Sequence, residues 1–236
     1  MKCSVAEDFI LKGGEFYDAK MDHTKQNASL KMSVNEDVIL LNGIFTTDKS
    51  VTSEFIMTGI GTSRWIQKPL CKASLGNVTV ASKHVLQIKG ETFGDISKGH
   101  TFQISDGAEL YCEKVVVKGE GEFVLESNAM LAIGHPEGIY SNGAKGNIQT
   151  QKRTYNSGAT YYYYMNSNPQ ETGVFQTQPK QNVIGKLIVN KSSTSQVLNL
   201  SQNLLLESPC MVTLGDIRSN GFELKVKEVI STAKLN

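Results

Sequence analysis

Residues 77–134 decide the fold of this chain, and they read NVTVASKHVLQIKGETFGDISKGHTFQISDGAELYCEKVVVKGEGEFVLESNAMLAIG. The stretch divides into short runs of alternating apolar and polar residues, such as Asn77–Val80, Thr101–Ile104 and Met130–Ile133. Alternation with a period of two indicates β-strands with one buried face, and the intervening Lys-Gly and Ser-Asp-Gly sequences indicate turns. Successive runs begin about 7–9 residues apart, so three runs would form one turn of about 21–25 residues. This spacing predicts a parallel coil with three short strands in each turn.

A related phrase recurs through the first hundred residues, where an apolar run is followed by turn residues and then by an aromatic or aliphatic residue. The four copies are FILKGGEF at 9–16, VILLNGIF at 38–45, FIMTGIG at 55–61 and LQIKGETF at 86–93. One such run is too short to bury an apolar face alone, whereas stacked copies bury a continuous core and pair their backbone edges. The repeat therefore favours a solenoid.

We predict an all-β fold, a parallel β-helix or β-solenoid, and expect its coil to be right-handed. The alternative is a β-sandwich of antiparallel hairpins, for which the Asn-Gly pairs at 42–43, 142–143 and 220–221 are candidate turns. The chain is expected to form a single domain, residues 1–236. Within it, 1–134 would form regular coils, 135–182 a loop-rich region, and 183–236 the last coils and a cap.

The composition argues against two classes of partner. The 24 lysines and arginines nearly balance the 23 aspartates and glutamates, so there is no basic excess to hold nucleic acid. No run approaches the ~18 consecutive apolar residues of a transmembrane helix, so no membrane insertion is expected. The 21 glycines against 5 prolines are typical of a β protein with many tight turns.

Neither the cysteines nor the histidines have the spacing of a metal site. The cysteines are Cys3, Cys71, Cys112 and Cys210. They form no C-x-x-C pair, so we expect idle or buried thiols, with a Cys71–Cys112 or Cys112–Cys210 disulfide as the alternative. The histidines, expected at the surface or in turns, are His23, His84, His100 and His135. We predict no metal and no cofactor.

From residue 123 onward the order of several motifs matters more than any one of them. A strand pair at 123–134 leads into GHPEGI at 134–139, GNIQTQKRTY at 146–155 and GATYYYY at 158–164. NPQETGVFQTQP at 168–179 and LIVNKS at 187–192 follow, and a segment at 204–226 ends in SNGFELKV. In this order the motifs resemble the repetitive, adhesin-like surface β-helix proteins of Bacteroidetes and flavobacteria, which are exported by the type IX secretion route.

The resemblance covers about 45% of the chain and implies a protein secreted or displayed on a bacterial cell surface. Neither the signal peptide nor the C-terminal sorting domain of that family is found, so we expect a trimmed part of a longer protein. The partners it implies are surface glycans or host or extracellular proteins, and it leaves the oligomeric state open.

Parallel β-helices also include polysaccharide lyases and hydrolases, so catalysis has to be considered. Glycoside hydrolysis requires two carboxylates at a set separation. The acidic residues near the expected strands are Asp95, Asp106, Glu109, Glu113, Glu120, Glu122 and Glu126. They form neither the Asp-Asp and Asn-Thr-Asp motifs of polygalacturonases nor the aspartate clusters with arginine of pectate lyases. We therefore predict that the protein is not an enzyme.

Residues 161–164 are four consecutive tyrosines within an expected strand. Alternation sends Tyr161 and Tyr163 to one side and Tyr162 and Tyr164 to the other. One pair would pack in the core. The other would form an exposed ladder that stacks on sugar rings or buries against a partner, unless it merely covers the strand ends.

Arg64 and Trp65 form a second aromatic candidate, with ordinary packing as the alternative. The predicted ligand contacts are thus Tyr162, Tyr164, Trp65 and Arg64. The predicted function is an adhesin-like structural or binding scaffold without catalysis, whose loops at 135–145 and 165–182 are held outward. The alternative is a carbohydrate-binding or carbohydrate-active β-helix, for which a cleft with carboxylates beside these aromatic residues would be the sign.

Overall fold

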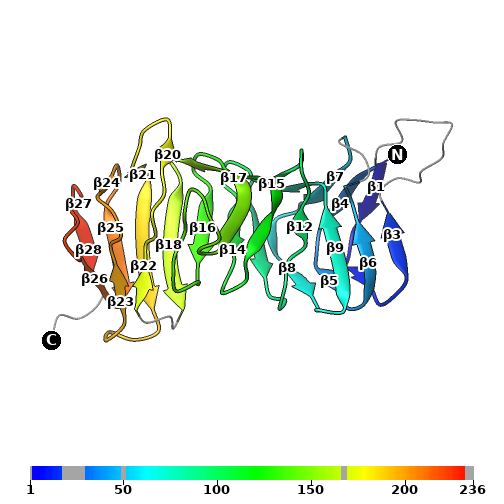
Figure 1. The fold of residues 1–236 in the computed structure, drawn as a ribbon, viewed down its shortest axis with the longest axis horizontal. Helices are drawn as coiled ribbons and strands as arrows, with labels where there is room; N and C mark the ends of the chain where they lie inside the picture. Colours follow the sequence, from blue (N-terminus) through cyan, green and yellow to red (C-terminus); the bar gives the residue numbers. More distant parts are fainter. Residues whose placement is uncertain (1, 18–29, 49–51, 166–168, 232–236) are drawn as a thin grey trace.

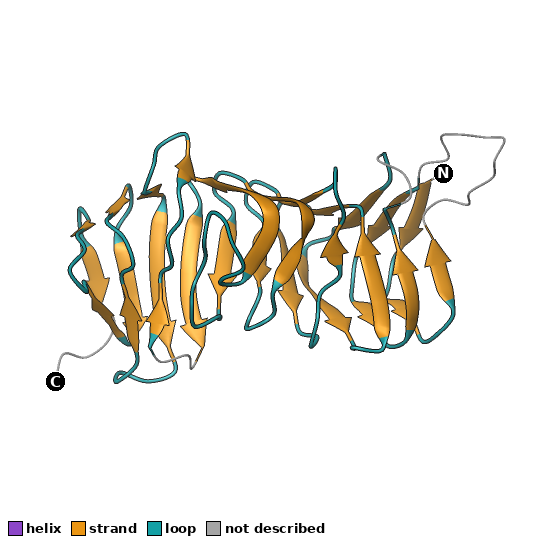
Figure 2. Cartoon of the chain, viewed as in Figure 1, coloured by secondary structure: helices purple, strands orange, loops and turns teal. Residues whose placement is uncertain are grey.

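The computed structural model describes residues 2–17, 30–48, 52–165 and 169–231, all of which lie in strands, turns or loops (Figure 2). The molecule is elongated, with strands running across its long axis and the two termini at opposite ends (Figure 1). Every pairing between the named strands is parallel, which confirms the predicted β-helix and is incompatible with the antiparallel sandwich. Short alternating runs adopt this arrangement because only stacking buries their apolar side chains.

Three faces surround the core, and each strand pairs with its counterpart one coil along the chain. The first face contains β1 (Lys2–Val5), β4 (Lys31–Val34), β7 (Glu54–Met57), β10 (Asn77–Val80), β13 (Thr101–Ile104), the second halves of β15 (Val117–Leu125) and β17 (Ile148–Asn156), and β20 (Thr177–Gln178). The third face contains β3 (Glu15–Tyr17), β6 (Gly43–Thr46), β9 (Cys71–Leu75), β12 (Asp95–Ile96) and the first halves of β15 and β17.

The second face is a ten-stranded sheet that runs the length of the molecule. It contains β2 (Phe9–Leu11), β5 (Val38–Leu40), β8 (Gly61–Gln67), β11 (His84–Ile88), β14 (Glu109–Tyr111), β16 (Met130–Ile133), β18 (Thr160–Met165), β22 (Lys186–Lys191), β25 (Cys210–Leu214) and β28 (Val229–Ser231). Two three-stranded sheets complete the C-terminal coils: β19 (Gln170–Glu171), β23 (Val197–Asn199) and β26 (Asp216–Arg218); and β21 (Val183–Ile184), β24 (Leu204–Leu206) and β27 (Leu224–Lys225).

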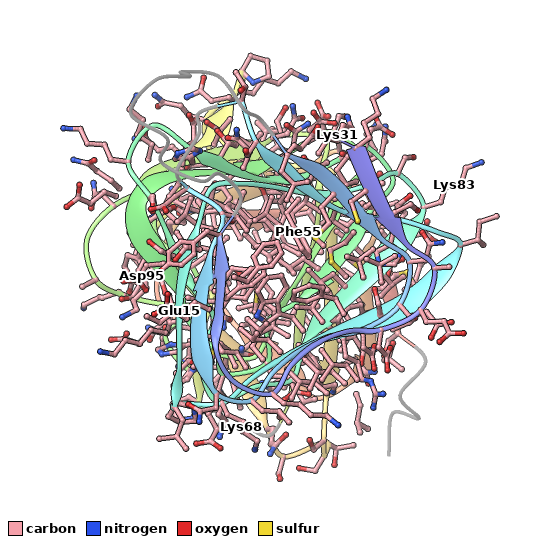
Figure 3. The ribbon with its side chains drawn as sticks, turned by 90° about the vertical axis from the view of Figure 1, so that its right-hand side faces the viewer. Glu15, Lys31, Phe55, Lys68, Lys83 and Asp95 are labelled. Carbon is pink, nitrogen blue, oxygen red and sulfur yellow. The ribbon has the colours of Figure 1, made fainter. Side chains whose placement is uncertain are left out.

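The length of one coil agrees with the sequence spacing. Along the first face, Met32, Phe55, Val78, Phe102 and Phe123 lie one above another and differ by 21 to 24 in residue number. These side chains point into the core, as Phe55 does in the end-on view, whereas Lys83 and Asp95 point outward (Figure 3). The alternation of the sequence is therefore the alternation between core and solvent.

Aromatic rings form a continuous stack inside the coil. Ring contacts with centroids 5.0–6.3 Å apart run from Phe9 through Phe45, Trp65 and Phe102 to Phe123. Their edge-to-face and offset arrangements are those that aromatic rings prefer. Because each coil places one or more rings on the rings of the coil before it, the core has no break between the regular coils and the region that follows.

One predicted turn is replaced by a bend within a strand. The Lys-Gly-Glu-Gly sequence at 118–121 lies inside β15, which continues from the third face onto the first. Gly119 has a φ of +127°, and a side chain there would collide with the backbone of Ile96 on the coil below. Glycine is required because the strand turns the corner while staying paired.

The excursion at 135–147 is packed along the coil and largely does not project, contrary to the expectation of an outward loop. The side chain of Arg153 donates hydrogen bonds to the carbonyls of Thr150, Tyr140 and Gly143. Ile139 is buried, and its backbone N–H donates to the carbonyl of Thr172 on the next coil. Pro136 and the tip, residues 142–145, are the exposed residues of this excursion.

No helix among the residues described has the length and apolar character needed to cross a membrane.

Replacing Phe102 by alanine should lower the free energy of unfolding by about 3–5 kcal/mol, because the ring is fully buried against Phe93 and Phe123. Unfolding in guanidinium, followed by the fluorescence of Trp65 and by circular dichroism, would measure the loss. The matched control is Phe222→Ala, which removes a ring that is 39% exposed and should cost less than about 1 kcal/mol. Equal losses in both variants would contradict the stacked core.

Candidate functional site

The candidate site lies on the outer surface of the second face, between β14 and β22. Strand register places Tyr111, Ala132, Tyr162 and Ile188 side by side on four neighbouring strands. Their neighbours in the chain, such as Leu110 on β14, point into the core. The site is therefore built from alternate residues of strands whose other residues hold the coil together.

The tyrosine run divides as the alternation predicts. Tyr161 and Tyr163 are buried in the core, and each donates its hydroxyl to a backbone carbonyl, that of Asn156 at 3.2 Å and that of Thr172 at 2.8 Å. Burial raises the pKa of both phenols well above the usual value, so they stay neutral donors. Tyr162 and Tyr164 lie on the outer surface, where they are half-buried.

The outer tyrosines are joined by a third ring that sequence reasoning missed. Tyr162 and Tyr164 are stacked with centroids 5.3 Å apart, and Tyr111 meets both edge-to-face at 6.1 and 5.8 Å. We call Tyr111, Tyr162 and Tyr164 the tyrosine cluster. Between them lies Ala132, whose side chain is completely covered. The signal for Tyr111 was present in the sequence, because it follows the inward Leu110 and so must point outward.

Two of the three hydroxyls of the cluster are engaged with neighbouring coils. Tyr164 accepts a hydrogen bond from the backbone N–H of Glu113 at 3.0 Å, and Tyr162 accepts one from Asn190 Nδ2 at 2.9 Å. Burial, with a contribution from Glu109, raises the pKa of Tyr111 to about 12, and burial also raises the pKa of Tyr164. The cluster thus links several coils through its rings and hydroxyls.

The geometry limits what the tyrosine cluster can bind. Sugar rings stack on an open aromatic face. Here one face of Tyr162 and one face of Tyr164 are turned toward each other, and the edge-to-face ring of Tyr111 lies against both. The stacked faces are therefore closed to a ligand, and a partner has to use the remaining ring surface and the polar groups at the margins.

Beneath the cluster, a row of buried polar side chains links successive coils at one corner. We call Asn147, Gln170 and Lys191 the corner ladder. Asn147 accepts hydrogen bonds from the N–H groups of Gly134 and His135 and donates to the carbonyls of Glu113 and Val115. All four bonding positions of its amide are therefore satisfied, as burial requires.

The upper part of the ladder ends in a buried amine. Gln170 Nε2 donates to the carbonyls of Ile133 and His135, and its Oε1 accepts from Lys191 Nζ at 2.6 Å. Lys191 is 2% exposed and reaches the carbonyl of Tyr164 at 3.5 Å. Burial lowers the pKa of Lys191 to about 8, because its acceptors are uncharged.

The prediction that Trp65 contacts a ligand at the surface is wrong. Its indole is completely buried and packs against Phe55 and Phe93, so it cannot touch a ligand outside the coil. Strand alternation sends the adjacent Arg64 outward, away from the ring. The packing alternative is the one the structure supports for Trp65.

Arg64 is placed on the surface but serves a cross-coil contact. Its Nε and Nη2 donate to Asp37 Oδ2 at 2.8 and 2.5 Å, and its backbone N–H donates to Asp37 Oδ1. Asp8 in turn accepts from the backbone N–H of Asp37. A shallow polar hollow of about 600 Å³ borders these residues and the exposed Ile60, four coils away from Tyr162 along the sheet.

Five of the seven acidic residues considered for catalysis make contacts between coils: Asp95, Asp106, Glu113, Glu122 and Glu126. Glu113 pairs with Lys89, Asp95 with Lys118, and Glu126 accepts from Gln103 Nε2. Within the described part of the chain, no group of three or more histidine, cysteine, aspartate or glutamate side chains is arranged to hold a metal ion. These contacts link strands side by side on the outer faces.

Two histidines lie in the core, which corrects the expectation that they are at the surface or in turns. His84 and His100 are buried, and His84 Nε2 contacts Ser63 Oγ at 2.5 Å. Burial lowers the pKa of His84, so this ring is neutral at physiological pH. His135 is half-buried in the excursion, and His23 lies outside the described residues.

All four cysteines are free thiols, and neither alternative disulfide is formed. Cys71, Cys112 and Cys210 are buried, and burial raises the pKa of each, which keeps the sulfur protonated and unreactive. Cys3 is exposed on the first strand.

Comparison of the chain with models of protein families, with curated proteins and with solved structures found no match.

The corner ladder predicts an unusual dependence of stability on pH. Between pH 8 and 10.5 the folded chain has released the proton of Lys191 while the unfolded chain retains it, so this lysine's contribution to stability rises with pH. Below pH 8 both states are protonated, and its contribution is least favourable. Replacing Lys191 by glutamine keeps a donor for Gln170 and removes the charge, so unfolding at pH 7 should cost on the order of 1 kcal/mol more.

Denaturant unfolding at a series of pH values would measure this, as the difference between Lys191→Gln and the wild type. The advantage of the variant should shrink as the pH rises from 8 to 10.5. The control is Lys152→Gln, which changes an exposed outward lysine on β17 and should give no such trend. A constant difference between Lys191→Gln and wild type over this range would contradict a buried amine with a lowered pKa.

Proposed function

We propose that this chain is a non-catalytic scaffold of an adhesin-like bacterial protein, secreted or displayed on the cell surface. The observation that carries the proposal is the stack of parallel coils from β1 to β28, with an aromatic core from Phe9 to Phe175. Such a stack holds surfaces at fixed distances along an axis, which is what a stalk has to do. The order of the motifs at residues 123–226 supports the proposed location outside the cell or on its surface.

Contacts between coils support a mechanical role. Besides the backbone ladders, ion pairs join neighbouring coils, for example Lys31 with Glu54 and Lys89 with Glu113. The corner ladder adds hydrogen bonds of buried amide side chains beside the excursion at 135–147. Because each coil contacts mainly its neighbours, force along the axis is borne one interface at a time.

Pulled from its two ends, the chain should extend in successive steps, each releasing one or a few coils. Single-molecule force measurements would record the steps. The variant Asn147→Ala removes four buried hydrogen bonds and should lower the force of the steps around the excursion, leaving the others unchanged. The control Asn142→Ala, at the exposed tip, should have no effect. Release of the whole chain in a single event would count against a stalk.

A second candidate function is carbohydrate binding, and the tyrosine cluster is the observation that favours it. Three half-exposed tyrosines lie beside the polar side chains of Glu109 and Asn190, a combination of apolar and hydrogen-bonding groups that suits sugars. Against it stands the stacking of the rings on one another. Binding would then have to use the ring surface that this stacking leaves open and the flanking polar groups.

Binding to a glycan array would test the second candidate function. If the cluster binds sugars, Tyr162→Ala and Tyr164→Ala should each weaken binding about tenfold or more, which corresponds to about 1.4 kcal/mol. Tyr17→Ala, which removes an exposed tyrosine at the far end of the molecule, should leave binding unchanged. Glycan binding that survives both substitutions in the cluster would rule out the tyrosines as the carbohydrate site.

A further inference from the structure

One outward row of the second face is apolar over six neighbouring strands, from β14 to β28. Strand register defines the row as Tyr111, Ala132, Tyr162, Ile188, Met211 and Ile230. The equivalent row on the first face mixes apolar and polar residues: Ser33, Ile56, Thr79, Gln103, Val124 and Thr154. The second face therefore carries a long apolar strip parallel to the axis, which we call the apolar row.

The apolar row is accessible in the isolated chain. Tyr111, Tyr162, Ile188 and Met211 are half-buried, and Ile230 is 40% exposed. Contiguous apolar surface of this kind, bordered by polar residues, marks a contact surface on a soluble protein. A partner that fits it has to be flat, and apolar over the strands at the centre of the contact.

The polar residues beside the apolar row have a directional charge pattern. Register places Glu109, Met130, Thr160 and Lys186 in an adjoining row on β14, β16, β18 and β22. An acid thus stands at one end of this four-strand segment and a base at the other. Neither Glu109 nor Lys186 forms an ion pair with any residue that the structure describes, although Lys89 and Glu113 on the same sheet do pair.

We propose that a second copy of this chain packs on the second face, about a twofold axis that runs parallel to the strands between β16 and β18. Such an axis keeps each residue's position along its strand and reverses the order of the strands. β14 of one copy then faces β22 of the other, and β16 faces β18. The two solenoids lie side by side in opposite directions.

This symmetry pairs the charges and places apolar residues opposite each other near the axis. Glu109 of each copy faces Lys186 of the other, so both unpaired charges find a partner, twice in the dimer. Tyr111 faces Ile188 and Tyr162 faces Ala132. Farther from the axis Met211 faces Gln87 and Ile230 faces Arg64, so the contact has an apolar centre and a polar rim. If the two solenoids instead ran in the same direction, β14 would face β14 and β22 would face β22. Glu109 would then lie nearest Glu109 of the other copy, and Lys186 nearest Lys186, which disfavours this arrangement.

The area is sufficient for a specific dimer. Eight strands from β8 to β28, spaced ~4.8 Å apart, span about 34 Å, and five residues along a strand span about 17 Å. Each copy would then bury roughly 580 Å², and the pair about 1,150 Å². A specific interface needs about 1,000 Å² or more.

The ring arrangement also favours a protein surface over a sugar. The faces of Tyr162 and Tyr164 that stack on each other are closed to a ligand, whereas ring edges and aliphatic groups remain open. A second copy offers the same edges together with Ile188 and Met211. The hydroxyls of Tyr162 and Tyr164 each already accept one hydrogen bond from a neighbouring coil.

Sedimentation equilibrium and light scattering over a range of protein concentrations would test the proposal. The wild type should form dimers. Glu109→Lys and Lys186→Glu each place like charges opposite each other, so each variant should dimerise at least tenfold more weakly. An equimolar mixture of the two variants restores both opposite-charge pairs and should form a heterodimer, and the double variant should dimerise again.

Controls separate a lost interface from a lost fold. Lys152→Glu makes the same charge change on the outward side of the first face and should dimerise like the wild type, and circular dichroism should be unchanged in every variant. A wild type that stays monomeric at high concentration would overturn the proposal, as would single variants whose mixture remains monomeric. Neither result would bear on the stepwise unfolding expected of the scaffold.

Discussion

In-register parallel stacking is the constraint on which the rest of this structure depends. A side chain that points inward on one coil lies directly against the inward side chain of the next, so each inward position must suit its neighbours above and below. Met32, Phe55, Val78 and Phe102 satisfy this along the first face. The same rule operates outside the core, where Arg64 neutralises Asp37 from the adjacent coil. The alternation of residues within each strand and the packing between coils thus follow from the same requirement.

Much of the fold follows from this rule and could be predicted from the sequence. Asn77–Val80, Thr101–Ile104 and Met130–Ile133 were expected as strands and are strands with the same bounds. The corners were harder to predict, because they depend on contacts between coils that the sequence does not display. The glycine-rich bend in β15 exists because Gly119 must pass close to Ile96 on the coil below. The path of the excursion at 135–147 likewise depends on Arg153, which follows it in the chain.

The candidate site was predicted in part, for the same reason. Alternation placed Tyr162 and Tyr164 outside and Tyr161 inside. It could equally have placed Trp65 inside, since Arg64 and Trp65 must point in opposite directions, but an isolated tryptophan gives no hint of which side is the core. Tyr111 joins the cluster from a distant part of the sequence, across a covered alanine. No pattern within a single strand could have shown that these rings meet.

The tyrosine cluster shows how stability and recognition compete for the same atoms. A ring whose face is stacked on a neighbour and whose hydroxyl is bonded to the next coil strengthens the solenoid, and the same contacts remove it from the set of groups that a small ligand could use. Tyr162 and Tyr164 each have one ring face stacked on the other ring and a hydroxyl that accepts a hydrogen bond. A partner can then gain free energy mainly by covering the remaining ring surface over a wide area. Broad, flat, symmetric contact is the form of recognition that a braced β-helix surface still permits.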